Sequence, residues 1–133
     1  MAPEIISESI DRASREDLKS MDVWSFAMVL FVLLNPDFHY PYQTELKEYS
    51  TLPGMLPHHL KKLMENQEQP KHSIKYENIR KTAWSEIMKV YELCVKFRDR
   101  PTMREVVKLV DMRILTEKVF LSLIFSLYSV LIY

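Results

Sequence analysis

The sequence predicts an all-α fold, and three observations lead to this prediction. Residues 23–34 are apolar except for Ser25, and an apolar run of this length exceeds that of a usual strand. Residues 82–97 carry apolar side chains at helical spacing, and no segment alternates polar and apolar residues as a half-buried strand does. The 133 residues are enough for one domain with a buried core.

The first long helix is expected over residues 23–34, with most of its surface buried. Ser20 and Asp22 stand just before it, where short oxygen-bearing side chains accept hydrogen bonds from the first N–H groups of a helix. Pro36 is expected to end this helix, because proline disfavours helical backbone at the residue before it. Trp24 is predicted to lie in the core, where large aromatic side chains contribute through burial.

The middle of the chain is predicted to hold a surface loop and then a second helix. Residues 37–57 contain proline, Gly54 and aromatic residues without a sustained period, which is typical of a loop. Helical spacing returns over residues 57–68, with Lys61 and Lys62 on the outward face. Residues 66–75 are polar again and are expected to end that helix.

The last part of the chain predicts two further helices. The first, over residues 82–97, has an apolar stripe made of Trp84, Ile87, Met88, Tyr91, Cys94 and Val95. The second begins at a capping box, in which Thr102 is followed three residues later by Glu105. Its expected apolar face consists of Met103, Val106, Val107, Val110 and Ile114.

Composition and charge bear on which classes of function are expected. The formal net charge is zero, with 18 basic and 18 acidic residues, so nothing electrostatic favours a nucleic-acid partner. Gly54 is the only glycine, and a phosphate-binding loop needs several glycines close together. Cys94 falls in an apolar stripe and is interpreted as a small buried hydrophobic residue. Charged residues such as Glu4 and Glu8 interrupt any signal-peptide core, so a cytoplasmic location is the default expectation.

No metal or catalytic site is expected. His58 and His59 are adjacent and would point about 100° apart on a helix, so they cannot share one metal ion. His39 and His72 are placed in loops without further ligands at metal-binding spacing. Cys94 has no neighbouring histidine or helix start to activate it as a nucleophile.

Residues 119–133 carry no charge and have no polar face. As a helix they would extend about 22 Å, which is short of the roughly 30 Å of a bilayer core. Three interpretations stay open for this segment: a membrane anchor, a last core helix, or non-native sequence read past a lost exon boundary.

Three short motifs occur in order: "APE" at residues 2–4, "DVWSFA" at residues 22–27 and "RDRPTMREVV" at residues 98–107. Together they resemble the C-terminal lobe of a eukaryotic protein kinase domain, with wording closest to the tyrosine kinase and tyrosine kinase-like groups. The resemblance covers a partial kinase domain over residues 1–110 and leaves residues 111–133 as an unassigned apolar tail. The fold implied is the helical C-lobe without the N-lobe and the catalytic loops.

The resemblance implies structural roles for four residues. Glu4 and Arg100 would form a buried ion pair, whose loss would strand a charge at a cost of about 3–5 kcal/mol. Asp22 would anchor the catalytic loop in the family; that loop is missing here, so a solvated helix cap is the better interpretation. Trp24 is a core residue under either interpretation. Ala27 departs from the glycine that the family usually has at this position.

The resemblance also determines the expected function. The glycine loop, the phosphate-pairing lysine, the catalytic loop and the metal-binding loop are not in this sequence. The chain is therefore predicted to be an inactive fragment of a protein kinase, with ATP and Mg²⁺ implied only for the complete domain. The alternative is a pseudokinase-like helical module that docks proteins through residues 57–68, where His58, Lys61 and Lys62 are the expected contact residues.

Overall fold

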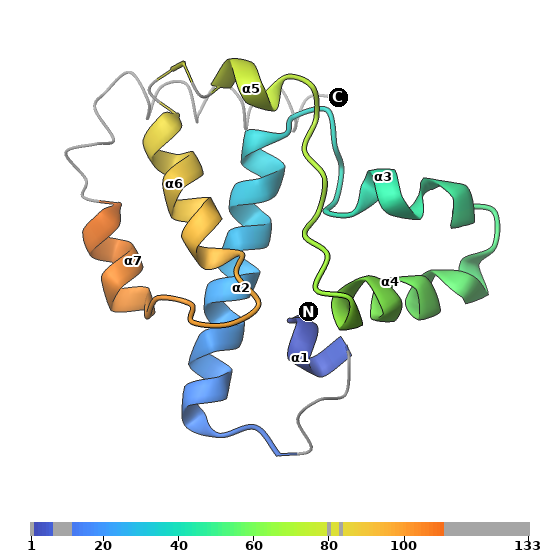
Figure 1. Ribbon diagram of the computed structural model, residues 1–133, viewed down its shortest axis with the longest axis horizontal. Helices are drawn as coiled ribbons and strands as arrows, with labels where there is room; N and C mark the ends of the chain where they lie inside the picture. Colours follow the sequence, from blue (N-terminus) through green and yellow to red (C-terminus); the bar gives the residue numbers. More distant parts are fainter. Residues whose placement is uncertain (1, 7–11, 80, 83, 111–133) are drawn as a thin grey trace.

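The computed structural model describes residues 2–6, 12–79, 81–82 and 84–110, and every regular element within them is a helix (Figure 1). The all-α prediction is confirmed for this part of the chain. Within the same part, no helix is both long and apolar enough to cross a membrane. The expectations for Ile114 and for residues 119–133 fall outside the described residues.

Helix α2 (Arg15–Leu34) is the longest element and runs through the centre of the fold (Figure 1). It starts earlier than predicted. Ser14 caps it, because the Ser14 hydroxyl accepts from the Asp17 N–H at 3.1 Å while the Asp17 carboxylate accepts from the Ser14 N–H at 2.8 Å. Ser20 and Asp22 therefore lie inside the helix and are not its cap. The predicted end is confirmed, since Asn35 is the C-cap.

Helices α6 (Ser85–Cys94) and α7 (Met103–Leu109) pack on α2 and on each other. The predicted stripe of α6 is confirmed: Ile87, Met88, Tyr91 and Cys94 are buried. The capping box of Thr102 and Glu105 is also present. Val107 was wrongly assigned to the apolar face of α7, because it is 64% exposed while the neighbouring Val106 is 1% exposed.

The segment predicted as a loop contains several short helical turns. These are α3 (Gln43–Leu46) and the 3₁₀ helices η1 (Lys47–Tyr49) and η2 (Pro53–Met55). The helix predicted over residues 57–68 is present as α4 (Leu56–Glu65), which ends three residues earlier than predicted. Short helices of one turn have too few residues to show an apolar period, which explains why the sequence pattern missed them. In Figure 1, α3 and α4 lie on the opposite side of α2 from α7.

Two one-turn helices complete the described part of the fold. Helix α1 (Pro3–Ile6) packs against α4, and α5 (Tyr76–Ile79) precedes α6. The connecting segment 66–75 runs from the end of α4 alongside α2 to α5 (Figure 1). The structure thus has a core of α2, α6 and α7, and a side unit of α3, η1, η2 and α4 that this segment joins to the core.

Candidate functional site

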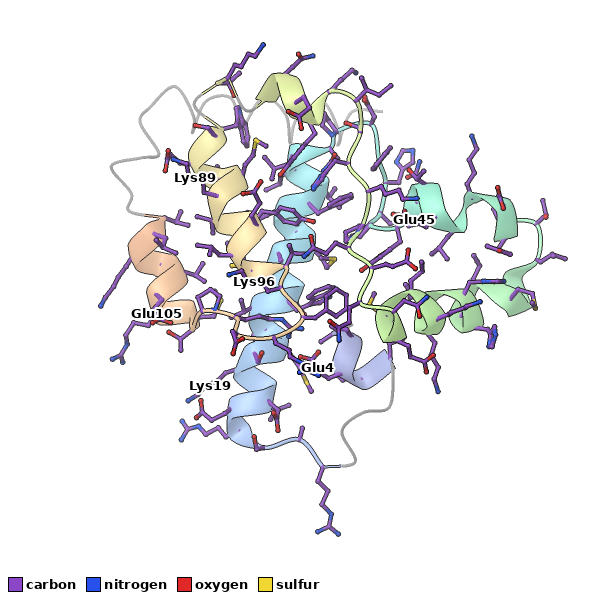
Figure 2. The ribbon with its side chains drawn as sticks, in the orientation of Figure 1. Glu4, Lys19, Glu45, Lys89, Lys96 and Glu105 are labelled. Carbon is purple, nitrogen blue, oxygen red and sulfur yellow. The ribbon has the colours of Figure 1, made fainter. Side chains whose placement is uncertain are left out.

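Glu4 and Arg100 meet in an ion pair that joins α1 to the connection between α6 and α7. The Arg100 Nη1 atom lies 2.6 Å from the Glu4 Oε1 atom. The side chain of Arg100 is 1% exposed and that of Glu4 is 21% exposed. Figure 2 labels Glu4 on α1, beside the lower half of α2. The structure therefore brings together two residues that are 96 positions apart in the sequence.

Arg100 also binds the other segments around it. Its Nη1 donates to the carbonyl oxygen of Ser20 at 3.1 Å and to the Ser20 hydroxyl at 3.3 Å. Its remaining nitrogens donate to the carbonyl oxygens of Lys96 and Phe97. The guanidinium carbon lies 4.9 Å from the ring centre of Trp24, which suits a cation–π contact. The buried guanidinium of Arg100 thus connects α1, α2 and the segment after α6. This is a structural role.

The other two residues singled out on α2 lie in opposite environments. Trp24 is fully buried and meets the ring of Phe97 edge-on, with 5.1 Å between ring centres. Asp22 is exposed on the solvent side of α2. It is solvated as expected, but it stands within the helix and caps nothing. Ala27 is fully buried.

The residues of the expected docking surface lie on α4, with different exposures. His58 and Lys62 are exposed, whereas Lys61 is half-buried. The ring of His59 stacks on Tyr49 of η1, with 3.4 Å between ring centres. Leu52 and Met55, just ahead of α4, are 56% and 45% exposed. Exposed apolar side chains thus precede α4, while the exposed His58 lies near its start and Lys62 in its last turn.

Burial makes the described nucleophilic groups less acidic. Loss of solvent around Cys94 raises the pKa of its thiol to about 11, so the thiol is neutral at pH 7. Burial also raises the pKa of Tyr91, and the nearby hydroxyl of Tyr76 adds to this effect. The pKa of Tyr42 is raised by burial and by the carboxylates of Glu45 and Glu68. None of these side chains is poised as a nucleophile.

One open depression, of about 620 Å³, lies between α6 and α7. It is lined by Leu93, Asp99, Arg100, Pro101, Glu105, Lys108 and Leu109. The two carboxylates and two cations in this lining balance each other, so its charge favours no ligand class. Among the described residues, no three His, Cys, Asp or Glu side chains gather where a metal ion could be held.

Sequence reasoning missed one polar cluster, formed by Asn35 at the end of α2 and His72 of the segment 66–75. Asn35 is fully buried and lies within hydrogen-bonding distance of His72. A buried asparagine at a helix end needs hydrogen-bond partners for its side-chain amide. This requirement was the only feature of the sequence that could have indicated a polar cluster at Asn35. The partner stands 37 positions away, beyond the reach of any local pattern.

No family model, curated protein or solved structure matches this chain.

Proposed function

We propose that this chain is the helical C-terminal lobe of a protein kinase domain and that residues 1–133 alone transfer no phosphate. The ion pair between Glu4 and Arg100 is the observation that carries the proposal. The resemblance implies a contact between its first and third motifs, and the proposal is supported by the 2.6 Å between Arg100 Nη1 and Glu4 Oε1.

Two further contacts support the same assignment. The second motif lies on α2, where Trp24 is buried under the guanidinium of Arg100. Ser20, two residues before that motif, accepts from the same guanidinium. Residues of the first and second motifs therefore both contact the guanidinium of Arg100, which belongs to the third motif.

The proposed lack of activity rests on the sequence. Phosphoryl transfer needs a phosphate-binding lysine, metal ligands and a catalytic aspartate held in position. The kinase motifs that supply these groups are not found in residues 1–133. We expect no Mg²⁺-dependent transfer from ATP to peptide substrates by the purified chain, and measurable turnover would overturn this part of the proposal.

The mass of the endogenous protein tests the kinase assignment directly. An antibody against residues 66–75, checked by silencing the gene, would isolate the protein for intact mass spectrometry and peptide sequencing. A species well above 15.9 kDa that contains the catalytic motifs supports a kinase parent. A single species at 15.9 kDa contradicts it and favours the alternative function.

The alternative is a helical module that docks proteins through residues 57–68. The observation that favours it is the exposure of His58 and Lys62 on α4, together with the exposed Leu52 and Met55 just before this helix. A photo-crosslinker at position 62 should capture a protein partner, whereas one at the exposed position 19 of α2 should not. Equal capture from both positions would count against docking at α4.

A further inference from the structure

The orientation of the Asn35 side-chain amide is determined by two backbone groups. Its Nδ2 atom donates to the carbonyl oxygen of Phe31 at 2.8 Å, and its Oδ1 atom accepts from the N–H of Ser73 at 2.9 Å. A carbonyl oxygen can only accept and a backbone N–H can only donate. The amide therefore cannot be turned round without losing both hydrogen bonds inside a fully buried site.

This orientation selects the tautomer of His72. The Asn35 Nδ2 atom lies 3.1 Å from the Nδ1 atom of the imidazole. Because Nδ2 offers only hydrogens, Nδ1 must accept, and the ring proton must be on Nε2. A protonated imidazole carries a hydrogen on both nitrogens. Protonation of His72 would thus place two donors against each other and break this contact.

Aromatic side chains hold the imidazole ring in place. The ring of Tyr76 stacks on it with 3.6 Å between ring centres, and the Phe31 ring lies 5.1 Å away. Tyr91 meets the ring edge-on at 5.2 Å. These contacts fix the plane of the ring, and the hydrogen bond from Asn35 favours the orientation with Nδ1 toward the amide nitrogen.

The charged groups on the neighbouring elements act in both directions. Tyr76 of α5, whose ring stacks on the imidazole, has its hydroxyl 3.5 Å from the Glu92 carboxylate of α6, and Glu77 follows Tyr76 on α5. Lys71 precedes His72 in the chain and Lys75 follows it, with Lys75 paired to Asp37 at 2.8 Å. Helix α2 contributes Phe31 and Asn35, which are uncharged. The contact at Nδ1 distinguishes the two protonation states directly, because the Asn35 amide nitrogen can donate only to a ring nitrogen that carries no hydrogen.

The same segment is fastened to the side unit by two other contacts. The Lys71 N–H donates to the Glu45 carboxylate at 2.7 Å, and the Tyr42 hydroxyl donates to the Glu68 carbonyl oxygen at 2.7 Å. Figure 2 labels Glu45 beside this segment. The contacts of Asn35 with His72 and Ser73 thus form a polar link between this segment and the end of α2.

We propose that His72 is a proton-sensitive latch that holds segment 66–75 on the end of α2 while the imidazole is neutral. Protonation breaks the contact with Asn35 and loosens the attachment of the α3 to α4 unit to the core. An ordinary histidine changes charge near pH 6.5, so the latch responds to mild acid. This inference is independent of the kinase assignment.

The direction of the pH effect follows from proton uptake. Below about pH 6.5 the unfolded chain binds a proton at His72, whereas the native chain binds it only by opening the latch. The native state is therefore stabilised by the latch above this pH and loses that stabilisation as the pH falls. One such group raises the unfolding constant up to about tenfold per pH unit.

Urea unfolding of the full chain at pH 7.5 and pH 5.5 tests the latch. In His72→Asn, the amide oxygen replaces Nδ1 as an acceptor for Asn35 and does not titrate. We expect the rise in the unfolding constant between these pH values to be about tenfold larger in the parent than in this variant. His39→Asn, at an exposed histidine, should keep the parent response. Equal pH responses of the parent and His72→Asn would overturn the proposal.

A second measurement decides the matter if His72→Asn does not fold. Nitrogen NMR of the imidazole in the full chain should show Nδ1 without a proton at pH 7.5. On acidification, exchange of the Ser73 amide hydrogen should accelerate in step with protonation of His72. A protonated His72 beside a Ser73 amide that stays protected would refute the latch.

Discussion

Arg100 connects three parts of the chain, because its guanidinium donates to Glu4 on α1, to Ser20 on α2 and to carbonyl oxygens after α6. Removing a buried partner leaves the opposite charge without compensation. We expect Arg100→Ala to lower the free energy of unfolding by about 3 kcal/mol, at the low end for buried pairs because water reaches Glu4. Urea denaturation measures this change.

The exposed pair of Lys19 and Glu16 is the matched control. It lies on α2 with 2.7 Å between the charged atoms, and both side chains are more than half exposed. Lys19→Ala should therefore change the free energy of unfolding by less than about 0.5 kcal/mol. If Arg100→Ala were no more destabilising than Lys19→Ala, the structural role of Arg100 would be wrong.

The thiol of Cys94 should be inert in the native protein. Burial raises its pKa to about 11, and the side chain is fully buried in the core. We expect a chromogenic thiol reagent at pH 8 to react with Cys94 only at the rate at which the chain unfolds. In denaturing urea, the rate of the reaction should rise to the rate at which the reagent reacts with free cysteine. Rapid labelling without urea would contradict the buried position.

At the scale of the elements, α7 provides a test within two adjacent residues. Val106 is 1% exposed and faces the core, while Val107 is 64% exposed. Val106→Ala should lower the free energy of unfolding by about 2 kcal/mol, because it removes buried methyl groups and leaves a cavity. Val107→Ala should change it by less than about 0.5 kcal/mol. Thermal and urea unfolding of the two variants measure the difference. Similar losses of unfolding free energy in both variants would contradict the orientation of α7 in which Val106 faces the core.

Helix ends were more predictable than helix faces. The capping box at Thr102 and the end of α2 at Asn35 depend on residues within one turn, so the sequence carries them directly. The start of α2 was missed because its capping box at Ser14 precedes two polar turns that show no apolar stripe. Which of two neighbouring valines faces inward depends on the rotation of α7 against α2 and α6, which no local pattern records.

For the whole molecule, local stability should differ between the core and the side unit. Helices α2 and α6 contribute most of the buried side chains, whereas η1 contributes none. Amide hydrogens in elements with few buried contacts exchange by local opening rather than by global unfolding. We expect the slowest hydrogen exchange in α2 and α6 and the fastest in α3, η1 and η2. Uniform exchange across these helices would show that the two parts open together.

The candidate site was only partly open to prediction. The resemblance pointed to Glu4 and Arg100, and the structure places them 2.6 Å apart. Spacing alone could not have paired two residues 96 positions apart. His72 was placed in a loop with no role, because its contacts with Asn35 and Tyr91 join segments that only the fold brings together.

The sequence by itself determined the helical class of the described part, the capping box of α7, the end of α2 and the burial of Trp24 and Cys94. Apolar period, capping and the backbone restriction before proline all act within a few residues, so a single chain segment contains them. The tertiary structure alone decided which face of α7 is buried and how Asn35 orients His72. These features depend on packing between distant segments, where geometry and loss of solvent set the energy of each contact.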